Sequence, residues 1–350
     1  MRRDHRGAEP RRGGALAAGV ARAGPEPDGR VERVSARDER FAAALGAAVR
    51  GEVKVEAPLA RYSTYRIGGP ATVVLPAAPE DVAAALRLAH RAGVPVFALG
   101  LGSNVLLPDE GLDALVIRLG KGLDGMRNEA ARWWLGAGLP APLAARKTAE
   151  QGWGGIHMMV GVPGTVGGGV FMNAGCHGGQ WADTVERVTV VNRSGDERSL
   201  TAKEIPFRYR HSGLDGDIVL EAEVVLRPGD PAELDAEVQK LFAWRQQGTP
   251  FNQPCCGSVF KNPDPPAPAG WGRAWTAGSL IEAAGLKETR VGGAVISPMH
   301  ANYFVNTGGA TAGDVRALIA RARETVHARF GVTLETEVKA VGSRGEHHHV

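Results

Sequence analysis

Residues 161–179 read GVPGTVGGGVFMNAGCHGG, and eight of these nineteen residues are glycine. Such a run cannot be an ordinary helix or strand, because each interior glycine costs conformational entropy. It offers bare backbone amides that a ligand can approach closely, and amides in turns and at helix starts attract anionic groups such as a diphosphate. Pro163 fixes φ early in the run, and Asn173 tolerates a left-handed backbone or offers its side-chain amide to a ligand.

A glycine-rich surface turn is the alternative interpretation of this stretch. A solvated linker would be polar, however, and the glycines here are interleaved with apolar residues, namely Val162, Val166, Val170, Phe171 and Met172. The stretch therefore predicts a buried cradle for a cofactor.

The composition is that of a soluble globular protein of two or three domains, with 350 residues, 43% hydrophobic and 23% charged. The net charge of +3 is small, so a basic nucleic-acid surface is not indicated. No apolar run approaches the roughly 18 residues of a membrane span. The three cysteines, Cys176, Cys255 and Cys256, suit a reducing compartment, and we expect a cytoplasmic location.

Both ends of the chain lack the marks of a folded domain. The arginine-rich residues 1–37 have no convincing apolar core before a cleavage site, which favours a disordered extension over a signal peptide. The end of the chain carries His347, His348 and His349, which could bind a metal, but a flexible tail is the preferred interpretation. We expect no metal site.

Strands and helices alternate before the cradle. Helices are predicted at 38–50, 79–92 and 141–151, and strands at 71–75, 94–99, 115–119 and 133–136. The strand at 94–99 runs into a second glycine turn, GLGSNVL, at 100–106. It has two glycines of G-x-G-x-x-G but Val105 in the third position, so a nicotinamide Rossmann fold is weakly supported. Ser103 and Asn104 instead suggest a second phosphate contact.

Beyond the cradle, the pattern predicts strands at 185–192, 218–226, 302–306 and 333–341, and helices near 201–205, at 231–247 and 276–284, and from 311. The composition shifts at 227–231, which favours a domain boundary there. Along 333–341 the charged residues alternate strictly with apolar residues and Thr336, which places Glu335, Glu337 and Lys339 on one face of the predicted strand. The pattern alone does not distinguish Glu335 from Glu337.

Eight motifs occur in one order between about residue 60 and 342. They are YRIGGP at 65–70, 100–106, 162–175, YRHS at 209–212, GSVFKNP at 257–263, GSLIEAAGLK at 278–287, HAN at 300–302 and 334–342. In this order and register the sequence resembles the UDP-N-acetylenolpyruvoylglucosamine reductase (MurB) family. The short spacing between Arg210 and Ser258 is similar to the family's compact subclass. Glu288 and Cys176 depart from common family residues, glycine and alanine, and neither falls on a presumed catalytic position.

The resemblance implies an α+β fold in which an FAD-binding part of the vanillyl-alcohol-oxidase/PCMH type, with two subdomains, precedes a C-terminal α+β substrate domain. The expected limits are 38–117 (completed by 331–342) and 118–228 for the FAD subdomains and 229–330 for the substrate domain. Residues 343–350 would be the flexible tail. The last strand would return to the first subdomain and bring Glu337 beside the cofactor.

The resemblance also implies noncovalent FAD, with NADPH as hydride donor, and UDP-N-acetylglucosamine enolpyruvate as the substrate reduced to UDP-N-acetylmuramate for peptidoglycan. The expected FAD contacts are Arg66, Gly100, Leu101, Gly102, Ser103, Asn104, Val105, Leu106, Val162, Pro163, Gly164, Thr165, Gly167, Gly168, Met172, Asn173, Ala174 and Gly175. No nucleic-acid or membrane partner is expected, and the protein is expected to be a monomer.

Three residues match the family's catalytic positions. Hydride would pass from the flavin N5 to the vinyl carbon of the substrate, leaving carbanion character beside its carboxylate. Arg210 matches the arginine that grips this carboxylate, Glu337 the glutamate beside it, and Ser258 the proton donor. Glu337 is expected to be protonated, because two carboxylates in contact do not both ionise cheaply. Taken singly, such an arginine is most often an ion-pairing surface residue and such a serine a turn residue.

Six weaker candidates for diphosphate, sugar or nicotinamide contacts are Tyr209, Lys261, Asn262, Lys287, His300 and Asn302. His300 could equally be a structural histidine. Two other classes of protein remain open from the sequence. One is a flavin-dependent oxidase on the same fold, for which we find no histidine-tether motif. The other is a non-catalytic nucleotide-sugar binding protein, which would need the cradle but not Arg210, Ser258 and Glu337 together.

Overall fold

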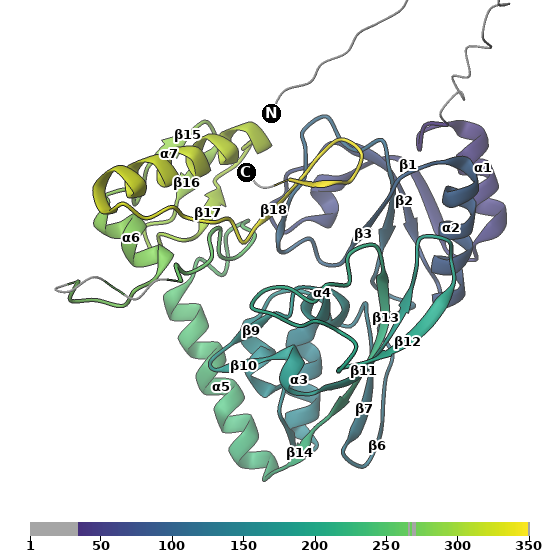
Figure 1. The fold of residues 1–350 in the computed structure, drawn as a ribbon, viewed down its shortest axis with the longest axis horizontal. Helices are drawn as coiled ribbons and strands as arrows, with labels where there is room; N and C mark the ends of the chain where they lie inside the picture. The colour runs from purple at the N-terminus through teal and green to yellow at the C-terminus, as the bar shows by residue number, and fades with distance from the viewer. Residues whose placement is uncertain (1–33, 265–266, 268–270, 349–350) are drawn as a thin grey trace, which may run out of the picture. The chain divides into compact units, whose positions relative to one another are not determined.

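The computed structural model describes residues 34–264, 267 and 271–348. The first sheet has the order β1 (Glu52–Pro58), β2 (Pro70–Leu75), β5 (Leu115–Arg118), β3 (Val96–Leu99). Figure 1 shows the strands β1, β2 and β3 of this sheet. The pairs β2–β5 and β3–β5 are parallel, and β1 is antiparallel to β2. The short helix η1 (Leu59–Tyr62) joins β1 to the loop before β2.

Helices α1 (Glu39–Ala48) and α2 (Pro79–Ala92) pack against each other beside this sheet. The Asp38 carboxylate caps α1, and α2 begins with Pro79 and ends at Gly93 in a left-handed conformation, as its sequence predicts. The strand–helix–strand unit predicted before the 100–106 turn is thus confirmed. Residues 1–33 of the predicted extension lie outside the described residues, whereas Ala36 is buried and Arg37 donates to the Pro70 carbonyl. The folded part therefore starts before residue 38.

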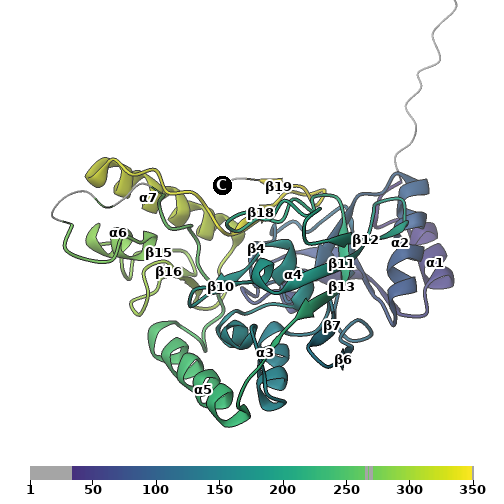
Figure 2. The ribbon, with the colours of Figure 1, turned by 60° about the horizontal axis from the view of Figure 1, so that its bottom comes forward.

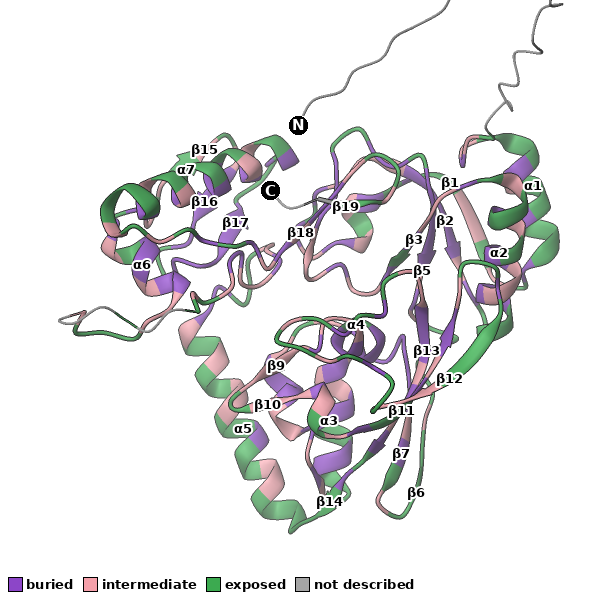
Figure 3. Cartoon of the chain, in the orientation of Figure 1, coloured by how far each residue is buried: buried purple, intermediate pink, exposed green. Residues whose placement is uncertain are grey.

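The second sheet is antiparallel and has the order β12 (Glu197–Thr201), β11 (Val185–Val191), β13 (Ile218–Val225), β7 (Arg132–Gly136), β6 (Met126–Glu129). Helices α3 (Ala141–Glu150), η2 (His157–Gly161), α4 (Val166–Phe171) and η3 (Trp181–Asp183) pack beside it, and β9 (Gly175–Cys176) pairs with β10 (Gly179–Gln180). Figure 3 shows that the central strands of both larger sheets are mostly buried. The helix predicted near 201–205 is wrong: the Glu204 carboxylate accepts hydrogen bonds from Thr201 and stabilises a turn there.

Helix α5 (Pro231–Gly248) packs on α3 and η2, and its Leu234, Val238 and Leu241 join the core beside the second sheet. Just before it, β14 (Arg227–Pro228) pairs with β8 (Trp153–Gly154). The chain therefore stays attached to the second sheet beyond the predicted boundary at 228. We propose that the C-terminal domain begins after α5.

The C-terminal part contains the sheet β15 (Arg290–Val291), β16 (Ala294–Ile296), β17 (Phe304–Asn306), with helices α6 (Ala277–Ala283) and α7 (Ala312–Phe330). The predicted cap of α7 is present, because Thr311 and Asp314 bond to each other's backbone amides. Leu280, Phe304 and Ile319 are fully buried in a core of their own.

The last segment returns to the 100–106 turn, as expected. In it β18 (Lys339–Val341) runs parallel to β4 (Val105–Leu106) and pairs on its other side with β19 (His347–His348); Figure 2 shows the three from a second direction. The predicted strand 333–341 is shorter because residues before Lys339 make only one isolated bridge, Thr336 to Phe260. The alternation of burial persists nevertheless. The predicted flexible tail is wrong as far as residue 348, since β19 is part of a sheet.

Among the described residues no helix combines the length and the apolar character that crossing a membrane requires. Within the same part of the chain, no three His, Cys, Asp or Glu side chains gather as metal ligands would.

Candidate active site

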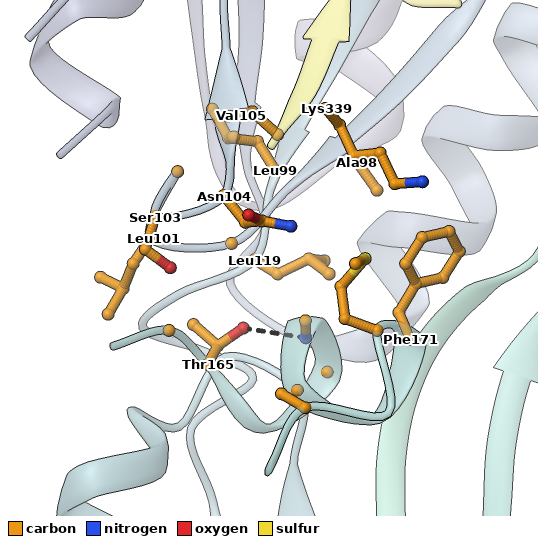
Figure 4. Close-up of a pocket in the computed structure, with 18 of the residues that line it drawn as sticks. Ala98, Leu99, Leu101, Ser103, Asn104, Val105, Leu119, Thr165, Phe171 and Lys339 are labelled. Carbon is orange, nitrogen blue, oxygen red and sulfur yellow. Dashed lines mark hydrogen bonds between the residues drawn. The ribbon is translucent and has the colours of Figure 1, made fainter. Parts of the chain in front are cut away.

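One cavity of about 410 Å³ is lined by both glycine turns and by Arg210, Ser258 and Glu337. Its volume lies in the range of small-molecule and cofactor sites, roughly 300–1,000 Å³. Figure 4 shows part of its wall, where the turn at 101–105 and Lys339 lie on one side and Thr165 and Phe171 on the other. Of the predicted cofactor contacts, all but Arg66, Leu106 and Asn173 line this cavity.

The turn after β3 has a backbone that requires glycine. Gly102 has φ +65°, and a Cβ there would lie 2.4 Å from the Tyr62 carbonyl oxygen. The side chains of this turn hold the site together. The Ser103 hydroxyl donates to the Pro163 carbonyl at 2.9 Å, and the Asn104 amide donates to the Glu337 carbonyl at 3.2 Å. Three segments far apart in the sequence are thereby joined at one wall.

The cradle is formed by the loop before α4 and by α4 itself. The prediction that the glycine run excludes an ordinary helix is therefore wrong over Val166–Phe171, where Thr165 caps α4. The Val166 and Gly167 amides donate to the Leu139 and Ala137 carbonyls, and the Gly168 amide donates to the Thr165 hydroxyl at 3.3 Å (Figure 4). The first amides of α4 are thus already paired, contrary to the prediction that they are bare. Among the described residues, no acceptor is found for the amides of Ser103, Asn104, Gly164 and Thr165.

This arrangement fits a flat, apolar cofactor with an anionic linker. The unpaired amides at the two turns would be satisfied by diphosphate oxygens. A Cβ on Gly100 would lie 2.7 Å from the Thr165 hydroxyl oxygen, so the turns approach each other too closely for a larger residue. The apolar wall, which includes Leu99, Leu119 and Phe171, suits an aromatic ring system.

Asn173 has a structural role in the described part of the chain. Its backbone is left-handed, with φ +42°, as its sequence suggested. Its side chain is buried and does not face a ligand: the amide donates to Gln180 and to the Arg208 carbonyl, and the oxygen accepts from the Ala182 amide. Leu106 is fully buried and Arg66 is exposed, and neither lines the cavity.

Arg210 and Glu337 form an ion pair at the cavity wall, with 3.0 Å between Nε and Oε1 and 19% of each side chain exposed. Arg210 also donates to the Gly175 carbonyl at 2.9 Å and lies over the Tyr209 ring, 4.7 Å from its centre. Burial raises the pKa of Glu337, and the neighbouring Arg210 lowers it in part. A cation, a carboxyl group of raised pKa and an opening into the cavity can together hold an incoming carboxylate.

The structure separates the two glutamates that the sequence pattern left equivalent. Glu335 is 75% exposed and pairs with Lys261 at 3.3 Å, outside the cavity. Glu337, two residues on, faces Arg210.

The six weaker substrate candidates do not line the cavity. Lys287 pairs with Glu282 at 2.8 Å, and the Asn262 side-chain oxygen accepts from the Ala277 amide at the start of α6. Asn302 is buried, with its side chain bonded to both backbone groups of Phe260 at 2.9 and 2.8 Å. Of the remaining candidates, Tyr209 is exposed and Lys261 pairs with Glu335. The Nδ1 of His300 accepts a hydrogen bond from the Asn302 amide.

Several polar residues of the cavity were missed from the sequence, among them Arg245, Tyr303 and Lys339. Lys339 could have been found, because strand alternation places it on the face of Glu337. Arg245 lies in the last turn of α5, where a basic residue is ordinary, and Tyr303 lies next to a short buried strand. The sequence around Arg245 and Tyr303 therefore contains no pattern that indicates a functional residue.

Comparison with known proteins identifies related sequences over most of the chain. The FAD binding domain profile matches residues 70–201, and the profile of the C-terminal domain of UDP-N-acetylenolpyruvoylglucosamine reductase matches residues 249–341, beginning directly after α5. A UDP-N-acetylenolpyruvoylglucosamine reductase of Caulobacter vibrioides is 40% identical over 301 residues, covering 85% of this chain and 97% of the relative. The protein of that name from Halalkalibacterium halodurans is 41% identical, covering 87% and 100%.

Among solved structures, the UDP-N-acetylenolpyruvylglucosamine reductase (MurB) of Thermus caldophilus aligns with a TM-score of 0.69 at 34% identity, covering 83% of this chain and 99% of that one. These matches confirm the predicted fold class, an FAD-binding α+β fold followed by a C-terminal domain, and FAD as the cofactor. The chain belongs to the UDP-N-acetylenolpyruvoylglucosamine reductase family.

Proposed function

We propose that this protein is an NADPH-dependent flavoenzyme that reduces UDP-N-acetylglucosamine enolpyruvate to UDP-N-acetylmuramate for peptidoglycan synthesis. The observation that carries the proposal is the convergence of Arg210, Ser258 and Glu337 on the cavity that both glycine turns line. These three residues come from different parts of the chain, and a protein that only bound a nucleotide sugar would not need them together. Bound FAD supplies the hydride chemistry.

The chain's own residues would act on the substrate carboxylate and on the carbon beside it. Arg210, held by the Gly175 carbonyl, can donate two hydrogen bonds to a carboxylate in a fixed geometry. Glu337, whose pKa is raised by burial, would stand protonated beside that carboxylate and donate to it. Both groups stabilise charge that develops there during the reaction. Ser258 lines the same cavity and would deliver the proton to the adjacent carbon.

A visible absorption spectrum tests the proposal directly. The purified protein should be yellow, and acid precipitation should release FAD into the supernatant. NADPH should bleach the flavin when oxygen is excluded, and UDP-N-acetylglucosamine enolpyruvate should restore the colour. Restoration by oxygen but not by this substrate would favour an oxidase. A protein that takes up no FAD would overturn the proposal.

We further propose that NADPH and the substrate use one site in turn, because both glycine turns and the three catalytic candidates line the same cavity and the sequence has no separate Rossmann fingerprint. Initial-rate plots should then be parallel, and high substrate should inhibit. Intersecting lines would contradict a shared site. The protein is proposed to act as a cytoplasmic monomer, which light scattering and cell fractionation would test.

A further inference from the structure

Two polar side chains that the proposed reaction leaves without a role lie beside Ser258. The Arg245 Nη2 donates to the Tyr303 hydroxyl at 3.0 Å, and both residues line the cavity together with Ser258 and Glu337. Tyr303 is 5% exposed, so its phenol is almost completely removed from solvent. A buried polar group is costly unless it is paired, and Tyr303 is paired on one side by Arg245.

The backbone holds Ser258 next to Tyr303. The Val259 amide donates to the Asn302 carbonyl at 2.9 Å, and the Asn302 side chain bonds to both backbone groups of Phe260. Val259, which follows Ser258, is therefore held against Asn302, which precedes Tyr303. The Ser258 and Tyr303 hydroxyls are thereby brought to the same part of the cavity wall.

The direction of this chain of hydrogen bonds follows from the chemistry of its first member. A guanidinium donates and does not accept, so the Tyr303 oxygen must be the acceptor from Arg245. The phenolic hydrogen of Tyr303 is then available to the Ser258 oxygen. This leaves the Ser258 hydrogen free to point into the cavity. The order of donation is Arg245 to Tyr303 to Ser258 to ligand.

This order of donation makes it easier for Ser258 to act as an acid. A serine that gives up its proton becomes an alkoxide, which is a far stronger base than a phenolate. Tyrosine has an ordinary pKa of about 10, and a phenolate beside Arg245 would be held by an ion pair. Burial raises the pKa of Tyr303, while Arg245 and the neighbouring Ser258 hydroxyl lower it in part, so at neutral pH the phenol holds its proton and can supply it.

We propose that Tyr303, backed by Arg245, is a positioning residue that orients Ser258 and replaces its proton. The proposal rests on the proposed function. The Ser258 O–H bond breaks as a C–H bond forms at the carbon next to the substrate carboxylate. The Tyr303 O–H bond breaks as its proton passes to the Ser258 oxygen. The negative charge comes to rest on the Tyr303 phenolate beside Arg245, and a water proton restores the phenol afterwards.

The test is Tyr303→Phe, studied by stopped-flow absorbance of the FAD-bound protein. The change removes only the hydroxyl and keeps the ring that packs edge-on against His300, with 4.9 Å between ring centres. Flavin reduction by NADPH should stay within about twofold of wild type. Reoxidation by UDP-N-acetylglucosamine enolpyruvate should slow by about tenfold or more. The matched control is Tyr65→Phe, which removes another buried phenol, one that contacts Cys256 and does not line the cavity.

A double variant separates a role through Ser258 from a general structural effect. In the Ser258→Ala background, Tyr303→Phe should change the reoxidation rate by less than about twofold, because the residue it serves is already gone. Slowing of both half-reactions by Tyr303→Phe, or an unchanged reoxidation rate, would overturn the inference. Additive losses in the double variant would do so as well. Failure of the wild-type protein to be reoxidised by this substrate would instead overturn the proposed function.

Discussion

Arg210 and Glu337 are separated by 127 residues in the sequence, yet the Arg210 Nε donates to the Glu337 Oε1 at 3.0 Å in the wall of the cavity. One residue follows the cradle, and the other lies in the segment that returns to β4. Burial raises the pKa of Glu337, and Arg210 opposes that rise. A substrate carboxylate that shares Arg210 would weaken this opposition and add a like charge, and both effects raise the pKa of Glu337 further.

Substrate binding should therefore take up a proton. At a pH between the pKa values of free and bound Glu337, the carboxyl is ionised before binding and protonated after it. Affinity should fall as the pH rises through the pKa of the bound state. Calorimetry at a series of pH values above the ordinary pKa of glutamate, each in two buffers of different ionisation enthalpy, should give different binding heats within that window. Glu337→Gln should remove that difference, whereas equal heats for the wild type would show that Glu337 does not change its protonation.

Ser258→Ala should separate the two half-reactions. Flavin reduction by NADPH should be nearly unchanged, since it requires no proton from Ser258. Reoxidation by the enolpyruvyl substrate should slow by about 10²–10⁴-fold, the usual effect of losing a general acid. Ser258→Cys should retain more activity than Ser258→Ala, because a thiol can still donate. Equal slowing of both half-reactions in stopped-flow traces would make Ser258 a structural residue.

Two neighbouring glycines of α4 should respond in opposite ways to alanine. A Cβ on Gly168 meets only the Thr165 hydroxyl, at 3.5 Å, and Gly168 lines the cavity. Gly168→Ala should raise the stability of the FAD-free protein by up to about 1 kcal/mol, from helix propensity, and weaken FAD binding. Thermal unfolding and the recovery of flavin fluorescence on release would measure the two effects.

Gly169→Ala is the matched variant on the other face. A Cβ on Gly169 would lie 2.3 Å from the Nε1 of Trp181, which is fully buried. The FAD-free protein should lose about 1–3 kcal/mol through overpacking. If Gly168→Ala destabilised the FAD-free protein as much as Gly169→Ala, the assignment of the two faces would be wrong.

Asn302→Ala should lower the free energy of unfolding, because Asn302 has a structural role and not a role in substrate binding. It leaves the amide and the carbonyl of Phe260 buried without partners, at about 1–3 kcal/mol each. Urea unfolding should show a loss of about 2–5 kcal/mol. The exposed Asn252→Ala should change stability by less than about 0.5 kcal/mol. If Asn302→Ala left the unfolding midpoint unchanged but raised KM for the substrate, Asn302 would be a substrate contact and not a structural residue.

The glycine turn at 100–106 could be predicted because one of its requirements is local: Gly102 needs a positive φ. The lack of room for a Cβ at Gly100 is not local, because it comes from Thr165 in the other turn. The caps of α1, α2 and α7 are local in the same way as Gly102, because a single side chain or a proline meets a neighbouring backbone group there.

Polar side chains in loops were predicted less well. The side chains of Asn173 and Asn302 can hydrogen-bond either to a ligand or to the backbone. Which partner they take depends on the carbonyls and amides that lie nearby. In both cases the neighbours, the Arg208 and Phe260 backbones, come from other parts of the chain. No spacing within the motif reveals them.

The sequence by itself determined most of the strands and helices, the presence of a cofactor cradle and the family, because these depend on periodicity, backbone conformation and motif order. The strand pattern left Glu335 and Glu337 equivalent, and only the resemblance to the family selected Glu337; the tertiary structure then placed Glu337 in the cavity wall. Only the tertiary structure decided that Arg245 and Tyr303 lie behind Ser258. These relationships depend on how segments far apart in the chain pack together. The return of β18 to β4 and the packing of α5 on α3 and η2 set that arrangement.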